Sequence, residues 1–220
     1  MARRRRKHLI LSHSGGGVPL LDSGICRYEQ DTYSTTSTMW MNAAPNQVTG
    51  PMASTVVAWP NFPADVAQFA AVAPNAELDA LTSCTFEAWV KLTANGFSSP
   101  VNRWTHLGAL IIANTGVPGY FDNSRSAQVY GATPVVLGSW AHIAVSLDNA
   151  ASTGTIYLNG AVDGSGLWNV DTGLTFGVYV GQLPGFWAVN GDIDTARLYN
   201  RALSADEILH NYTAGIAGHQ

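Results

Sequence analysis

The sequence is poor in charged residues. Asp, Glu, Lys and Arg make up 12% of its 220 residues, about half of the roughly 25% found in an average soluble domain. So few charges exclude a disordered chain, a coiled coil and a nucleic-acid enzyme rich in Lys and Arg. They also predict a surface that relies on small polar side chains or is covered by neighbouring molecules.

Cysteines and long hydrophobic runs are scarce as well. The two cysteines, Cys26 and Cys84, lie far apart and form no metal-binding pair, so we expect buried thiols and no disulfide framework. No stretch approaches the roughly 18 apolar residues of a membrane span, and we expect no membrane association. The basic start of the chain is followed by a very short apolar patch, which is too small for a secretory signal. We therefore expect a protein that is not exported.

The basic residues are unevenly distributed along the chain. The formal net charge is −4, yet five of the 11 Lys and Arg residues fall at the very start: Arg3, Arg4, Arg5, Arg6 and Lys7. Residues 1–17 end in a Ser/Gly hinge and are predicted to form a basic N-terminal arm. Such an arm can bind nucleic-acid phosphates through counterion release, dock into an acidic groove of another protein, or remain a solvated tail. The sequence leaves these alternatives open.

Residues 18–64 and residues 65–220 differ in pattern. The first segment combines Thr and Ser runs with several prolines, which predicts extended chain with some first strands. In the second, short apolar or alternating runs recur between turn residues, which predicts an all-β antiparallel sandwich. In its first run, residues 84–92, one set of alternate positions is small or apolar, and we expect Glu87 and Lys91 to face solvent. Further strands are expected at 107–113, 140–148, 155–158, 174–180 and 193–199.

Two local signals mark a turn and a helix. Asn159-Gly160 predicts a hairpin turn, because both residues tolerate positive φ. Ser204 and Glu207 have the spacing of a capping box, and Gly215 follows an apolar stripe. They predict one short C-terminal helix, which must dock on the sandwich to persist.

Three segments of the second region resemble a known family. Residues 85–91 are similar to its strand motif F-T-x-E-x-W-V-K, and residues 140–145 and 156–160 follow in the same order. Residues 191–204 look like its closing strand and the turn into its last helix. The chain from about residue 65 to 215 thus resembles the laminin G-like branch of the concanavalin A-like lectin/glucanase jelly rolls. The resemblance implies a jelly-roll fold, while the activity stays open because relatives include sugar binders, adhesion modules, glycosidases and virion proteins.

Several carboxylates have spacings that could serve catalysis or metal binding. Glycosidases of this fold place carboxylates on one strand, and residues 29–31 and 77–79 begin such E-x-D patterns without supplying the third acid. We therefore expect no enzyme. Asp192 and Asp194 share one face of an expected strand and could bind Ca²⁺; in the alternative structural role, Asp194 caps the nearby turn or pairs with Arg197 or Arg201. We expect no cofactor and no resident metal site, with Ca²⁺ as the one alternative.

Aromatic residues supply the candidates for partner contact. Trp89, Trp140 and Tyr157 lie in expected strands and are predicted to pack internally, and His142 is predicted to be a structural group. Aromatic residues nearer expected loops could stack on sugar rings or contact a protein, with burial as the alternative. These residues are Trp104, Trp168, Phe186 and Trp187.

Two functional hypotheses follow. The first is a non-enzymatic structural virion protein of a bacteriophage: a capsid decoration, cement or minor capsid component on the capsid surface, assembled in the host cytoplasm. Its arm and residues 18–64 would pin the sandwich to the major capsid protein or other shell subunits. A homo-oligomer, guessed to be a trimer, and arm contact with nucleic acid are further expectations, and weak glycan adhesion is compatible with this role. The alternative is a carbohydrate-binding, lectin-like module of a fibre or cell-surface protein.

Overall fold

The computed structural model describes residues 24–29, 38–44, 47–52, 57–58, 68–72, 79–103, 108–122, 127–168, 177–181 and 187–219. Before residue 79 it describes the backbone of the strands alone. The predicted basic arm, residues 1–17, therefore lies outside the described residues.

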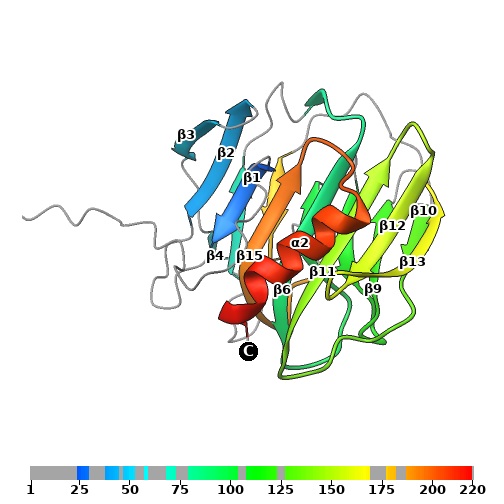
Figure 1. Cartoon of the computed structure of the whole chain (residues 1–220). Helices are drawn as coiled ribbons and strands as arrows, with labels where there is room; N and C mark the ends of the chain where they lie inside the picture. The colour runs from blue at the N-terminus through cyan, green and yellow to red at the C-terminus, as the bar shows by residue number, and fades with distance from the viewer. Residues whose placement is uncertain are drawn as a thin grey trace, which may run out of the picture.

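Two antiparallel sheets form the molecule (Figure 1). The eight-stranded sheet has the order β13 (Ala161–Leu167), β12 (Thr153–Leu158), β11 (Trp140–Asp148), β6 (Cys84–Leu92), β15 (Gly191–Tyr199), β1 (Gly24–Glu29), β2 (Thr38–Ala44) and β3 (Gln47–Met52). The seven-stranded sheet has the order β10 (Ala127–Tyr130), β9 (Pro118–Asp122), β8 (Gly108–Ile112), β7 (Ser98–Arg103), β14 (Val178–Val180), β5 (Gln68–Val72) and β4 (Val57–Ala58). The predicted jelly-roll sandwich is thus confirmed.

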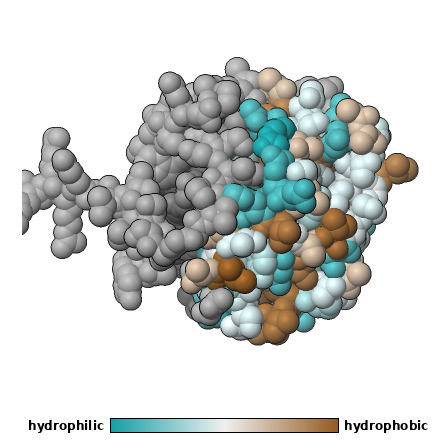
Figure 2. Space-filling model, in the orientation of Figure 1, coloured by the Kyte–Doolittle hydropathy of each residue, from teal (hydrophilic) through white to brown (hydrophobic). Residues whose placement is uncertain are grey.

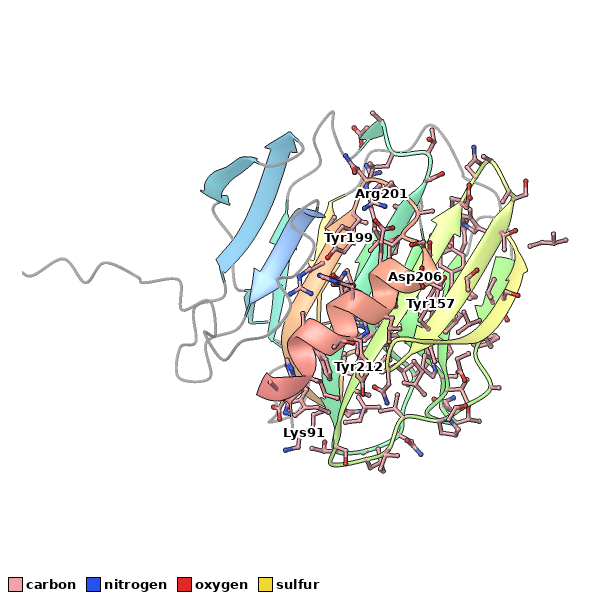
Figure 3. All side chains as sticks on the ribbon, viewed as in Figure 1. Lys91, Tyr157, Tyr199, Arg201, Asp206 and Tyr212 are labelled. Carbon is pink, nitrogen blue, oxygen red and sulfur yellow. The ribbon has the colours of Figure 1, made fainter. Side chains whose placement is uncertain are left out.

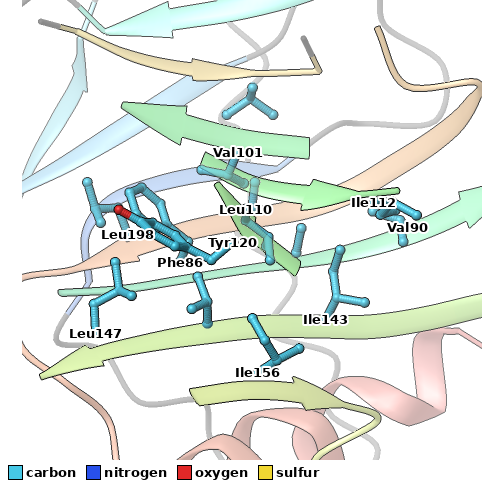
Figure 4. Packing of buried hydrophobic residues seen from close by; sticks show 14 of the residues in the cluster. Phe86, Val90, Val101, Leu110, Ile112, Tyr120, Ile143, Leu147, Ile156 and Leu198 are labelled. Carbon is cyan, nitrogen blue, oxygen red and sulfur yellow. The ribbon is translucent and has the colours of Figure 1, made fainter. Parts of the chain in front are cut away.

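The main core fills the space between the two sheets. Alternate residues of β6 point into it, as the sequence predicts. Phe86 from this strand meets side chains of the opposite sheet, including Leu110 of β8 and Tyr120 of β9 (Figure 4). All three are fully buried, and each buried side chain of this size contributes about 1.5–3 kcal/mol to folding. Cys84 also lies in this core as a free thiol, and burial raises its pKa, so the predicted buried thiol is confirmed at this position.

The helix α2 (Ala205–Gly215) covers the outer face of the eight-stranded sheet, in front of β15, β6 and β11 (Figure 1). A second apolar cluster lies at this contact and includes Tyr157, Tyr199 and Ile208, the first two of which are labelled on the sheet in Figure 3. The expectation that Glu87 faces solvent is therefore wrong, since this side chain is 1% exposed beneath the helix. Lys91, at the end of the same face, is half-buried.

The start of α2 has the predicted capping box. Ser204 Oγ accepts a hydrogen bond from the backbone N–H of Glu207, and Glu207 accepts one from the backbone N–H of Ser204. Arg201 donates two hydrogen bonds to the same carboxylate, at 2.6 and 2.8 Å. Mainly because of this arginine, the pKa of Glu207 falls to about 2. The short 3-10 turn η1 (Ile216–Gly218) follows the helix.

The turn between β12 and β13 has the predicted geometry. Asn159 and Gly160 have φ values of 50° and 79° in the turn between β12 and β13, as a two-residue hairpin loop requires. None of the described helices has the length and apolar character needed to cross a membrane. On the face that carries α2, hydrophobic residues are scattered among hydrophilic ones (Figure 2).

Candidate functional site

The outer face of the seven-stranded sheet carries a group of aromatic side chains. On β9, Tyr120 points into the core, so its neighbour Phe121 points to the opposite, outer face. Phe121 pairs with Ala109 of β8, and Ala109 in turn pairs with Asn102 of β7. Because directly opposite residues share a face of the sheet, these side chains define its outer surface.

Trp187 joins two phenylalanines on this surface. The ring centroids of Trp187 and Phe97 are 4.4 Å apart, and those of Trp187 and Phe121 are 5.4 Å apart in an edge-on arrangement. All three residues are half-buried. We call Phe97, Phe121 and Trp187 the aromatic platform.

The indole of Trp187 lies over β8. Its two ring partners come from either side of that strand, since Phe97 directly precedes β7 and Phe121 is on β9. The outward residues of β8, Ala109 and Ile111, are fully buried although they do not belong to the core between the sheets. This position of the indole, between rings on either side of β8, is consistent with the burial of these side chains.

The backbone of Trp187 is in a rare conformation. Its φ is +54°, a region that bulky residues seldom adopt. The other described non-glycine residues with positive φ, Ser152 and Asn159, lie in turns between strands. Hydrogen bonds hold the strained segment: Ser99 N–H donates to Trp187 O at 2.8 Å, and Val189 N–H donates to Gly181 O at 2.9 Å. Backbone strain that is fixed by its surroundings is a feature of binding sites.

Polar groups flank the platform. The amide of Asn190 lies against Gly96, next to Phe97 in the chain. Gln128 of β10 pairs directly with Phe121 and is exposed. Aromatic faces beside neutral amides can stack on the C–H face of a sugar and hydrogen-bond its hydroxyl groups.

The predicted contact residues divide into three groups. Trp187 belongs to the aromatic platform. Trp168 was predicted as a partner contact, and this is wrong for the folded chain, because its side chain is 1% exposed in the main core. Its indole N–H donates to the hydroxyl of Tyr120 at 2.8 Å, so the chain turns inward after β13. Trp104 and Phe186, like Arg3, Arg4, Arg5, Arg6 and Lys7, lie outside the described residues.

The sequence did not single out Phe97 or Phe121. Phe97 directly precedes β7, a strand that was not predicted from the sequence. Phe121 lies on β9, a short strand that begins with a proline. The alternation of Tyr120 and Phe121 is the one available signal, since one of two neighbouring aromatic residues in a strand must face outward.

A second polar group lies under α2 and is closed to solvent. Arg197 of β15 donates to Glu87 at 2.6 Å, and Asn211 of α2 donates to it at 2.9 Å. Tyr199 donates to the same carboxylate at 3.1 Å, and His142 Nε2 lies 3.5 Å from it. All five side chains are at most 5% exposed. This Glu87 network ties the helix to the sheet, and the predicted structural role of His142 fits its position.

The charge of Glu87 is fixed by its surroundings. Burial alone would raise its pKa, but the nearby imidazole of His142 and the charge of Arg197 hold the pKa well below its ordinary value. The same carboxylate, together with burial, raises the pKa of Tyr199. This carboxylate is enclosed and its contacts lie inside the fold, so the cluster serves packing.

Other candidate polar residues are also engaged in structure. Asn211 begins an Asn-x-Thr sequence, yet its side chain is fully buried in the Glu87 network. Asp79, from the second E-x-D pattern, forms an ion pair with the buried Arg103. Asp192 is exposed, and the side chain of Asp194 is not described. Within the described ranges, no group of three or more His, Cys, Asp or Glu side chains is placed to hold a metal ion.

The fold and the sequence together define the family. A laminin G-type family model, described as the concanavalin A-like lectin/glucanases superfamily, matches residues 65–209, about two-thirds of the chain. The protein belongs to this family. No curated protein sequence matches the chain.

Solved structures with the same fold include sugar complexes. Domain 4 of AbnA, an extracellular arabinanase from Geobacillus stearothermophilus in complex with arabinotriose, is 17% identical, with 90% of this chain and 86% of that chain covered and a TM-score of 0.52. The CBM40 of Ruminococcus gnavus IT-sialidase, bound to α2,6-sialyllactose, is 20% identical, with coverage of 63% and 86% and a TM-score of 0.51. The binding domain of botulinum neurotoxin DC with SialylT is 13% identical and has a TM-score of 0.56. That match covers 87% of this chain and 51% of the toxin domain chain.

Proposed function

We propose that the protein is a non-catalytic carbohydrate-binding protein whose ligand stacks on the aromatic platform. The observation that carries this proposal is Trp187, a half-buried tryptophan held at positive φ between two further aromatic rings. Rings fixed in advance lose little conformational entropy on binding, which favours recognition of flat sugar faces. The sugar-bound structures of the same fold support the ligand class.

Replacing Trp187 by alanine is expected to weaken sugar binding about 30-fold, because a central tryptophan in a binding site contributes at least about 2 kcal/mol. The whole chain is first screened on a panel of arabino-, xylo- and cello-oligosaccharides together with sialyllactose. The affinity for the ligands found is then measured by isothermal titration calorimetry. A repeat in EDTA tests the Ca²⁺ alternative.

Trp140→Ala is the matched control. Trp140 is also a half-buried tryptophan, but it lies on β11 in the other sheet and contacts His219. The control should keep the affinity of the original chain. Equal affinities for all three proteins, or no binding to any sugar of the panel, would contradict the proposed function.

Attachment to a virus particle is a separate proposal, which rests on the basic arm of residues 1–17. If the arm anchors the sandwich to a capsid, deleting it should abolish incorporation into particles while sugar affinity stays within about twofold. Density-gradient sedimentation of the source lysate measures incorporation, and calorimetry measures the sugar affinity. A full-length chain that stays at the top of the gradient would refute the capsid role and leave carbohydrate binding untouched.

A further inference from the structure

A fourth aromatic side chain lies on the same sheet face as the platform. Val129 of β10 points into the core, so Tyr130 points outward. Tyr130 is 37% exposed and pairs directly with Gly119 of β9. Gly119 is two residues from Phe121 and shares its face.

Gly119 allows the tyrosine ring to lie on β9. A Cβ atom at this position would be 2.5 Å from Cδ1 and 2.9 Å from Cε1 of Tyr130, so any side chain there would displace the ring. The φ of Gly119 is not in the left-handed region, so the glycine is required for space and not for its backbone conformation. The ring of Tyr130 thus lies against the neighbouring strand at Gly119.

Together the four rings lie on neighbouring strands of one sheet face. Tyr130 extends from β10 over β9, Trp187 lies over β8, and Phe97 stands at the start of β7. From β10 to β8 there are two strand spacings of about 4.8 Å, or about 10 Å, and Phe97 at the start of β7 extends the row to about 14 Å; both lengths exceed the width of one sugar ring. Gln128 lies two residues before Tyr130 on the same face and offers an exposed amide along this row.

We propose that the site binds a chain of several linked sugar rings across β10, β9 and β8, with Tyr130 as the contact farthest from Trp187, and not a single terminal sugar. This inference rests on the proposed function. A chain places one ring on the Trp187 side and another on Tyr130, and the amide of Gln128 on β10 meets hydroxyl groups at the Tyr130 end. Each further ring then adds affinity until the row is filled.

The test compares chain lengths. Affinities of the full-length protein are measured by calorimetry for arabino-, xylo- and cello-oligosaccharides of one to six rings, with sialyllactose as a short ligand that ends in a charged sugar. We expect affinity to rise about tenfold between two and four rings. In Tyr130→Ala, the ratio of the affinities for four-ring and two-ring ligands should fall to within about twofold, because the contact farthest from Trp187 is lost.

Leu209→Ala is the control variant, since Leu209 is 48% exposed on α2, over the other sheet, and should leave the ratio unchanged. Urea unfolding of each variant verifies that the compared proteins are folded. Affinity that is independent of chain length, a ratio that Tyr130→Ala does not change, or binding of sialyllactose alone would overturn this inference while leaving the proposed function standing. No binding of any sugar would overturn both.

Discussion

Replacing Glu87 by glutamine is expected to lower the free energy of unfolding by about 3–5 kcal/mol, the usual cost of breaking a buried ion pair from one side. Glutamine keeps the shape of the side chain and removes its charge. The guanidinium of Arg197, 5% exposed, then loses the carboxylate that it contacts at 2.6 Å. Asn211 and Tyr199 also donate to this carboxylate, so the contact between α2 and the sheet weakens as a whole.

The same substitution should change how stability depends on pH. The pKa of Glu87 is lower in the folded chain than in the unfolded chain, because the nearby imidazole of His142 and the charge of Arg197 outweigh the effect of burial. Its stabilising contribution is therefore complete above the unfolded pKa, about 4.3, and is lost as the pH falls toward the folded value. The original protein should thus lose more stability on acidification than Glu87→Gln. The low pKa of Glu207 acts equally in both proteins and cancels from the comparison.

Urea unfolding at about pH 7 and about pH 3.5 measures both effects. The difference in free energy of unfolding between the original protein and Glu87→Gln should be smaller at the lower pH. Asp206→Asn is the control, because Asp206 is exposed in the first turn of α2 and contributes at most about 1 kcal/mol through the helix dipole. The double variant Glu87→Gln with Arg197→Met should recover part of the loss, since it removes both buried charges. A loss below about 1 kcal/mol in Glu87→Gln would show that the network is not what fixes α2 to the sheet.

The sandwich could be predicted from the sequence because alternation reports which residues point into the core. It does not report what covers the opposite face. Glu87 occupies an outward position of β6 and therefore resembled a surface residue, whereas α2, more than 100 residues later, encloses it. The capping box predicted that helix correctly, and its need for a docking surface was also predictable. Which face it would cover depended on contacts between distant parts of the chain.

The candidate site was predictable only in part for the same reason. Trp187 was selected as an aromatic residue near a loop, and it belongs to the platform. Its partners Phe97 and Phe121 are brought to it by the order β7, β8 and β9 in the sheet, which no local pattern contains. Trp168, in contrast, was selected as a candidate contact residue but is buried in the main core. It directly follows an exposed strand end, but the alternation that places Leu167 outward also turns Trp168 inward.

Replacing Trp168 by alanine is expected to lower the free energy of unfolding by about 3–5 kcal/mol, because it opens a cavity in the main core. The indole packs edge-on against Tyr120, with ring centroids 6.4 Å apart, and donates its N–H to the tyrosine hydroxyl. The backbone N–H of Trp168 also donates to Ser152 O at 2.9 Å, which fixes the end of β13 against the turn before β12. Trp168→Phe should cost less, since it fills most of the volume and loses only the hydrogen bond.

The adjacent residue provides the control for this prediction. Leu167 is 84% exposed, so Leu167→Ala should change the free energy of unfolding by no more than about 0.5 kcal/mol. Urea unfolding followed by circular dichroism compares the three variants with the original chain. Because Trp168 lies inside the core and Trp187 on the outer face, Trp168→Phe should also keep the sugar affinity that Trp187→Ala loses. A stable Trp168→Ala variant with weakened sugar binding would place this tryptophan at the surface and contradict the inward turn after β13.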